Sequence, residues 1–224
     1  MKPNLVPYDK FRPENEGRAY EFLFMLSHFS PERVKFGDEK SLKGQELYCR
    51  NVRRDPETGE IPPIMTGPDF RNTHSITGFC GIDTRTNLIW YRIHNETNDS
   101  EQFLLDVEAA VADGFLRRGD VLVLDNVSYH SKRKCAILED WLWKRFDIFV
   151  LFLPPRTPEW NPIELLWNNL VRNLGTYPLS VIRDDLRKNG SSIDAVAYVA
   201  KRILDGMDHD LVKKCYDHCF KGVL

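Results

Sequence analysis

Hydrophobic residues recur along the chain with two different periods, and these periods predict which segments are helices and which are strands. Apolar residues spaced three and four apart predict helices, whereas alternating residues or short unbroken apolar runs predict strands. The predicted helices are residues 20–29, 99–116, 134–146, 161–174, 180–188, 193–206 and 211–220. The predicted strands are residues 33–38, 75–82, 88–94, 120–125 and 148–153. After the first helix the order is βββαβαβα, which predicts an α/β protein with a mixed sheet.

This pattern divides the chain into three parts. Residues 1–33 form a lead-in helix and linker, residues 34–174 the α/β domain, and residues 175–224 a helical C-terminal appendage. Gly, Pro, Asp and Arg dominate residues 43–71, which predicts a flexible insertion because little of it can be buried. Residues 83–87 are rich in turn formers, which predicts that the strands on either side form an antiparallel hairpin.

Composition narrows the class of protein. The 224 residues are 42% hydrophobic and 29% charged, as expected of a globular protein. No apolar stretch is long enough to span a membrane or serve as a signal peptide, so we expect a protein that is not secreted, located in the cytoplasm or, in a eukaryote, the nucleus. The net charge of −2 gives no indication of nucleic acid binding. Five scattered cysteines predict reduced thiols, and Cys215 and Cys219 fall on a predicted helix, which favours buried thiols over a zinc site.

Three acidic residues stand at the ends of predicted elements. Asp38 ends the first strand, Asp125 ends the apolar strand 120–125, and Glu164 lies in the first turn of the helix after strand 148–153. Both of these later strands are unbroken apolar runs, as expected of strands covered on both faces. Converging carboxylates repel one another unless cations neutralise them, and oxygen ligands favour Mg²⁺ or Mn²⁺ over Zn²⁺. The pattern therefore predicts a site for two such ions that acts on phosphodiester bonds.

Each acidic residue also has an ordinary structural interpretation. Asp38 is a common residue type where strands stop, and Glu39 is an alternative first ligand. Asp125 is able to cap the turn that follows it. Asn161 and Glu164 match a helix N-cap and the third position of a capping box, with a proline between them at the first helical position.

Two motifs late in the chain resemble the catalytic domain of the mariner-superfamily DNA transposases, which are DDE-type endonucleases. The family pattern has a buried strand that ends in Asp-Asn, a following His, then Leu-Pro-Pro, Pro, and Asn-Pro-Ile-Glu before a Trp. The matching residues are Asp125-Asn126, His130, Leu153-Pro154-Pro155, Pro158, Asn161-Pro162-Ile163-Glu164 and Trp167. The segment 34–40 resembles the strand that carries the first Asp of the family, here Asp38.

The resemblance implies a ribonuclease-H-like fold and a triad of Asp38, Asp125 and Glu164 that binds the metal ions. Asn126, His130 and Asn161 would be auxiliary residues. The implied reaction is metal-dependent cleavage and strand transfer, with transposon ends and target DNA as partners and a homodimer as the usual assembly. No membrane partner is expected.

The sequence also departs from the family. The spacing from Asp125 to Glu164 is longer than in the best-known mariner transposases, and residues 1–33 are too few for the helix-turn-helix modules that read transposon ends. Two alternatives therefore stay open: a domesticated or degenerate module that binds nucleic acid or protein without catalysis, and a nuclease that cuts without rejoining.

Overall fold

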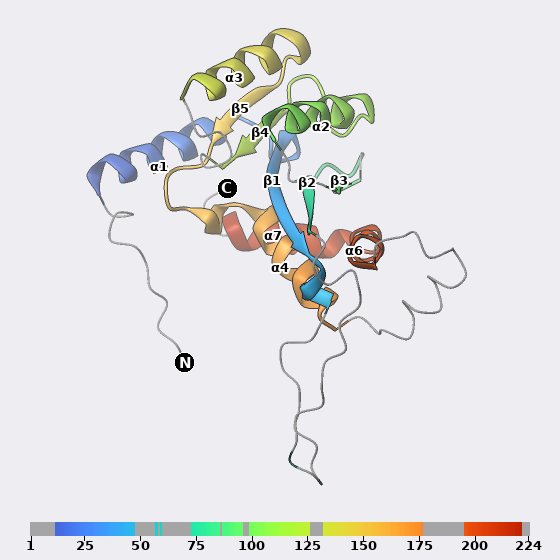
Figure 1. Ribbon diagram of the computed structural model, residues 1–224. Helices are drawn as coiled ribbons and strands as arrows, with labels where there is room; N and C mark the ends of the chain where they lie inside the picture. The colour runs from blue at the N-terminus through green and yellow to red at the C-terminus, as the bar shows by residue number, and fades with distance from the viewer. Residues whose placement is uncertain are drawn as a thin grey trace.

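A five-stranded mixed sheet with the order β3-β2-β1-β4-β5 forms the centre of the structure (Figure 1). The structure, a computed structural model, describes residues 12–47, 57, 59, 73–85, 87–95, 99–125, 132–176 and 195–220. The strands are β1 (Val34–Lys43), β2 (Thr73–Gly81), β3 (Ile89–His94), β4 (Val121–Leu124) and β5 (Phe149–Phe152). The α-helices are α1 (Pro13–Leu26), α2 (Ser100–Ala112), α3 (Lys132–Phe146), α4 (Pro162–Leu174), α6 (Ala195–Asp205) and α7 (His209–Phe220). Short 3-10 turns are η2 (Pro31–Arg33), η3 (Gly44–Leu47) and η5 (Pro158–Trp160).

The order of elements from β1 to α4 matches the predicted βββαβαβα, and the mixed α/β class is confirmed. The hairpin prediction is also confirmed, because β2 and β3 pair antiparallel. Helix α1 begins at Pro13, well before the apolar pattern at 20–29, since its first turns are polar and proline suits the first helical position. Most of the predicted insertion 43–71 and all of the predicted helix 180–188 lie outside the described residues.

Strand β1 changes its neighbours along its length, and this overturns one prediction. It pairs parallel with β4 only from Val34 to Gly37, but it pairs antiparallel with β2 from Lys35 to Lys43. Asp38 was predicted to end the strand, and that is wrong: the strand continues because its β2 partner continues. The polar residues after Asp38 keep the β-conformation through ladder hydrogen bonds on one side alone.

Helices cover both faces of the sheet and form a hydrophobic core with each (Figure 1). Helices α2 and α3 pack on one face, over the inward residues of β2 and β4. Helices α4, α6 and α7 pack on the other face, together with apolar residues of α1. Strand β4 is fully buried, as predicted, but β5 is partly exposed, with Phe149 at 41%. The prediction that β5 is covered on both faces is wrong because β5 is the edge strand.

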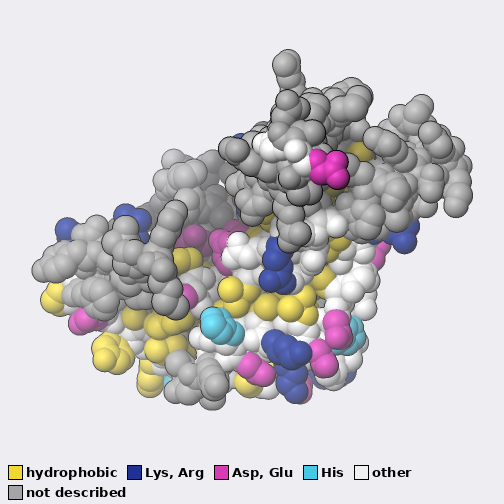
Figure 2. All heavy atoms as spheres, turned by 90° about the horizontal axis from the view of Figure 1, so that it is seen from below, with side chains coloured by type: hydrophobic (Ala, Val, Ile, Leu, Met, Phe, Trp, Pro, Cys, Tyr) yellow, Lys and Arg dark blue, Asp and Glu magenta, His cyan; other side chains and the backbone are white. Residues whose placement is uncertain are grey.

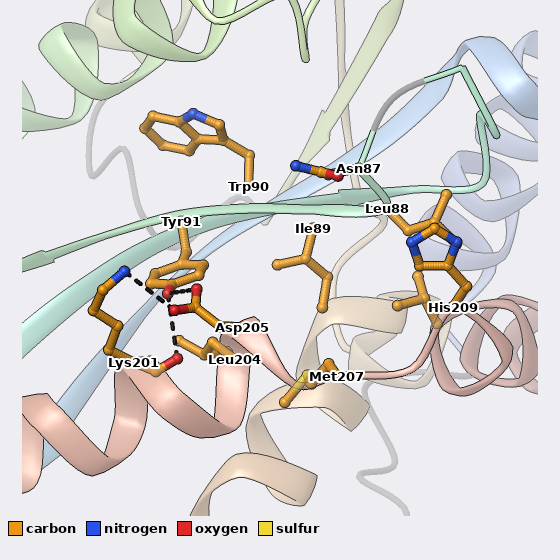
Figure 3. Close-up of a pocket in the computed structure, with 11 residues that line it drawn as sticks. Asn87, Leu88, Ile89, Trp90, Tyr91, Lys201, Leu204, Asp205, Met207 and His209 are labelled. Carbon is orange, nitrogen blue, oxygen red and sulfur yellow. Dashed lines mark hydrogen bonds and ion pairs between the residues drawn. The ribbon is translucent and has the colours of Figure 1, made fainter.

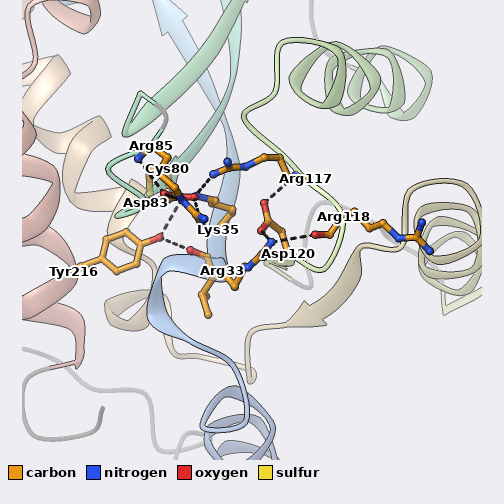
Figure 4. Close-up of polar contacts among 10 residues, drawn as sticks. Arg33, Lys35, Cys80, Asp83, Arg85, Arg117, Arg118, Asp120 and Tyr216 are labelled. Atoms are coloured by element: carbon orange, nitrogen blue, oxygen red, sulfur yellow. Dashed lines mark hydrogen bonds and ion pairs between the residues drawn. The ribbon is translucent and has the colours of Figure 1, made fainter.

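A polar cluster around the buried side chains of Lys35 and Asp83 lies near the amino end of β1 (Figure 4). Asp83 accepts hydrogen bonds from Arg85 and Arg117, and the Lys35 Nζ lies 4.0 Å from Asp83 Oδ2. Burial lowers the pKa of Lys35, while the hydrogen bonds from Arg85 lower the pKa of Asp83. The carboxylate therefore compensates a buried ammonium that has no hydrogen-bond partner among the described residues.

Helix α7 is attached to the sheet by one buried tyrosine. The Tyr216 hydroxyl lies 3.0 Å from the carbonyl oxygen of Val34 and 3.1 Å from that of Cys80, one on β1 and one on β2. Cys215 and Cys219 on the same helix are buried, as predicted, and burial raises the pKa of the Cys219 thiol to about 12. The C-terminal helices thus share the core of the sheet.

Candidate functional site

Asp38 and Asp125 lie side by side at the carboxyl end of β4, in the middle of the sheet. Gly37 and Leu124 are the last parallel pair of β1 and β4; Asp38 is the next residue of β1, and Asp125 directly follows β4. Neighbouring strands are about 4.8 Å apart, and laterally paired residues project to the same face. The register therefore brings the two side chains to the same place, at the carboxyl end of β4.

Helix α4 brings the third acidic residue to this place. It packs against β1, and its residues Glu164 and Trp167 share one face because they are three apart. The indole Nε1 of Trp167 donates a hydrogen bond of 3.0 Å to Asp38 Oδ2, and Glu164 shares a side-chain hydrogen bond with Asp38. The structure thus brings Asp38 and Glu164 into direct contact.

The predicted capping box is not formed within the described part of the chain. Asn161 is the N-cap residue of α4, but its side chain makes no capping hydrogen bond. Its backbone N–H donates to the carbonyl of Pro158 at 3.0 Å, so it does not engage the Glu164 carboxylate. The prediction of this capping role for Glu164 is therefore wrong, and its side chain interacts with Asp38 instead.

The electrostatics of the site are those of crowded carboxylates. Burial and the charge of Glu164 raise the pKa of Asp38 to about 7, against the backbone N–H of Glu39 and the indole of Trp167, which favour the ionised form. Burial also raises the pKa of Glu164, and the charge of nearby Lys40 opposes that shift. Around pH 7 the Asp38 carboxyl is therefore only partly ionised.

The donor chemistry of the site fits a hard divalent cation. Asp38, Asp125 and Glu164 supply oxygen ligands only, which is the set that Mg²⁺ and Mn²⁺ prefer. Among the described residues, no group of three or more His, Cys, Asp or Glu side chains is arranged to hold a metal ion. Binding of an ion would therefore require any proton on Asp38 to leave and the carboxylates to turn toward one centre.

The remaining predicted residues have different outcomes. Asn126 and His130 lie outside the described residues. Asn161 is buried at 2% exposure, and its Oδ1 has no hydrogen-bond partner among the residues that the structure describes. Glu39, the alternative first ligand, projects to the opposite face of β1 from Asp38, because successive strand residues alternate. Asp38 is the one that contacts Glu164.

Sequence reasoning missed two residues of this site. Trp167 was interpreted as part of a motif and as packing, and its hydrogen bond to Asp38 was not predicted. The spacing of Glu164 and Trp167 was the available signal, since it puts both on one helix face. Lys40 lies two residues after Asp38 and so on the same face of β1.

A cavity of about 380 Å³ lies between β3 and helices α6 and α7 (Figure 3), and Ile89, Tyr91 and His209 are among its lining residues. It includes none of the three acidic residues.

Acidic, basic and hydrophobic side chains are interspersed on the face shown in Figure 2. None of the described helices is both long and apolar enough to span a membrane.

Comparison with known proteins places this site in context. Residues 62–183, more than half of the chain, match the family described as DDE superfamily endonuclease. An uncharacterized protein, y4pE/y4sA of Sinorhizobium fredii (strain NBRC 101917 / NGR234), is 32% identical over 72 residues, which are 32% of this chain and 46% of that protein.

Two solved structures are similar in fold. The Mos1 strand transfer complex aligns with 96% of this chain and 64% of its own, at a TM-score of 0.57 and 15% identity. The mariner Mos1 paired-end complex with Mg aligns with 96% and 65%, at a TM-score of 0.55 and 14% identity. The chain thus spans less than two thirds of these transposase chains and less than half of the bacterial relative, and the likeness supports the ribonuclease-H-like fold predicted from the motifs.

Proposed function

Since the chain belongs to the DDE superfamily endonucleases, we propose that it is a transposase catalytic domain that cleaves DNA and transfers the cut strand. Asp38, Asp125 and Glu164 would hold two Mg²⁺ or Mn²⁺ ions. The single observation that supports this best is the contact between Asp38 and Glu164 beside Asp125, at the carboxyl end of β4. Ligands of open α/β sheets bind at the carboxyl ends of strands.

The raised pKa of Asp38 is a further argument for a cation. An ionised Asp38 destabilises the fold through burial and through the charge of Glu164, and carboxyl groups with such raised pKa values are common at functional sites. A bound cation would offset both effects by stabilising the ionised form. The mariner complex with Mg is a precedent in the same fold.

The residues of the site have separate tasks in the proposed reaction. Bound Mg²⁺ would activate the attacking hydroxyl and stabilise the leaving oxygen of an in-line displacement at phosphorus. Asp38 lies within β1 and Asp125 directly follows β4, whereas Glu164 approaches from the first turn of α4. Attack by water would form a bond from its oxygen to phosphorus and break the bond from phosphorus to the 3′ oxygen, leaving a 5′-phosphate and a 3′-hydroxyl. That hydroxyl would then attack a target phosphodiester, forming a new P–O bond to the target 5′ side and releasing a target 3′-hydroxyl.

The first test is Asp125→Asn, assayed by nicking of supercoiled plasmid in Mg²⁺. We expect nicking to be lost while the circular dichroism spectrum and unfolding midpoint stay close to wild type. Asp140→Asn is the matched control, because Asp140 is an exposed carboxylate on α3 whose partner is Lys144. Equal nicking by wild type and Asp125→Asn would contradict the proposal.

Further assays separate the two alternatives from a transposase. A protein that binds nucleic acid without catalysis would neither nick DNA nor bind Mn²⁺ in isothermal titration calorimetry. A nuclease that cuts without rejoining would nick plasmid but fail to join pre-cleaved ends to a target. We infer a homodimer acting on two DNA ends, in the bacterial cytoplasm or the eukaryotic nucleus, and analytical ultracentrifugation with paired ends tests the assembly.

A further inference from the structure

One hydrogen bond connects helix α4 to Asp38. The indole N–H of Trp167 donates to Asp38 Oδ2 at 3.0 Å, and Trp167 is only 1% exposed. A hydrogen bond to an ionised acceptor is stronger and more directional than a neutral one. The contact therefore restricts the rotation of the Asp38 carboxyl group about its Cβ–Cγ bond.

A glycine on the neighbouring strand makes room for this indole. Gly78 is the cross-strand partner of Asp38 in the β1–β2 ladder. A Cβ at position 78 would lie 2.5 Å from Cη2 and 2.7 Å from Cζ2 of Trp167. Glycine weakens a strand interior, and it commonly marks a close approach. Here the close approach is that of the ring that contacts Asp38.

We propose that Trp167 is a positioning residue for the metal site, and that Gly78 is the clearance it requires. The indole donates to Oδ2 of Asp38 and thereby limits the rotation of the carboxylate that would hold the cation. The same face of α4 carries Glu164, so this one helix supplies a metal ligand, Glu164, and also orients a second ligand, Asp38, through Trp167. This inference rests on the proposed function, since it assigns a role at that same site.

The alternative is that Trp167 only fills the core. Trp167→Phe removes the N–H together with the part of the ring that faces Gly78, so lost packing and lost hydrogen bonding have to be separated. The structure offers a way to do so: the double variant Gly78→Ala/Trp167→Phe puts a methyl group into the vacated space and leaves the hydrogen bond absent.

The experiment measures the Mn²⁺ dissociation constant by isothermal titration calorimetry and the unfolding midpoint by circular dichroism. We expect Trp167→Phe to weaken Mn²⁺ binding at least tenfold, the order of magnitude for lost outer partners of metal ligands. The double variant should unfold at a higher temperature than either single variant yet bind Mn²⁺ as weakly as Trp167→Phe. Trp90→Phe is the control, because it removes an indole hydrogen bond to Asp113, at 2.9 Å, that does not involve the acidic residues.

The outcomes are distinguishable. If wild type does not bind Mn²⁺, the proposed function fails. If wild type binds and Trp167→Phe binds equally well, the positioning role is wrong. If the double variant regains both stability and Mn²⁺ affinity, Trp167 acts through packing alone and the inference is also wrong. Replacement of Trp167 by β-(3-benzothienyl)alanine, which keeps the bicyclic ring but lacks the N–H, should reproduce the weak binding without loss of stability.

Discussion

Neutralising one acidic residue of the candidate site should make the protein more stable. The change is Asp38→Asn, which keeps an oxygen that is able to accept the indole hydrogen bond of Trp167 but removes the negative charge beside Glu164. The pKa of Asp38 is raised in the folded protein, so the folded state binds this proton more tightly than the unfolded chain. Stability is therefore highest below the ordinary pKa and falls as pH rises toward 7.

The size of the effect follows from the two pKa values. The rise from 3.8 to about 7 corresponds to about 4 kcal/mol of lost stability once Asp38 is fully ionised. The asparagine also gives up charge-assisted hydrogen bonds, which are worth about 1.5–3 kcal/mol. We therefore expect a net gain of about 1–3 kcal/mol at pH 8, and a smaller gain at pH 5, where the wild-type carboxyl is largely protonated in the folded state.

Urea unfolding in EDTA, at pH 8 and at pH 5, provides the measurement. Asp140→Asn is the control: it removes an exposed carboxylate, and the free energy of unfolding should change by less than about 1 kcal/mol at either pH. An Asp38→Asn variant that is less stable than wild type at pH 8, or whose difference from wild type does not vary with pH, would refute the reasoning. Added Mg²⁺ should stabilise wild type more than the variant, because a ligand stabilises the state that binds it.

Two further predictions concern the contacts that hold the sheet together. Asp83→Ala should lower the free energy of unfolding by about 3 kcal/mol, because it removes one of the two buried carboxylates, Asp83 and Asp120, that offset the charge of the buried Lys35 ammonium. Urea unfolding measures this, and adding Lys35→Met should recover part of the loss. If the single and double variants are equally unstable, the charge argument is incorrect. Tyr216→Phe should lower the free energy of unfolding by about 1–2 kcal/mol, because the buried carbonyl oxygens of Val34 and Cys80 lose their hydroxyl partner. Thermal unfolding measures this, with Tyr198→Phe on α6 as the control. An unchanged unfolding midpoint for Tyr216→Phe would exclude a stabilising role for the Tyr216 hydroxyl.

The order of elements was predictable from periodicity, but the position of a strand in the sheet was not. Strands β4 and β5 have equally apolar sequences, yet β4 is buried and β5 forms an edge. An unbroken apolar run indicates only that the segment makes apolar contacts. Whether a strand has one or two neighbouring strands depends on the topology of the sheet. The end of β1 was misjudged for a related reason: Asp38 leaves β4 but continues beside β2, and only the pairing reveals this.

The acidic residues were found through motifs, while their mutual contacts required the fold. Nothing local to Asp38 indicates that its partners are Glu164 and Trp167. The hydrogen bond from Trp167 to Asp38, for example, joins residues that are 129 positions apart in the sequence. The same limit applies to the capping box at Asn161. The residue types matched the motif, but the backbone N–H of Asn161 was already engaged by Pro158 and Glu164 turned to Asp38.

The shared core of the sheet and the C-terminal helices has a consequence for motion. Helix α4 packs against β1 on one side and against α6 and α7 on the other, and Tyr216 connects α7 to β1 and β2. We expect α4, α7 and β1 to open as one cooperative unit, so their backbone amides should exchange hydrogen slowly and at similar rates. The backbone segments that carry Asp38 and Glu164 then move apart only when this whole unit opens, so changes at the site within the folded protein are rotations of side chains.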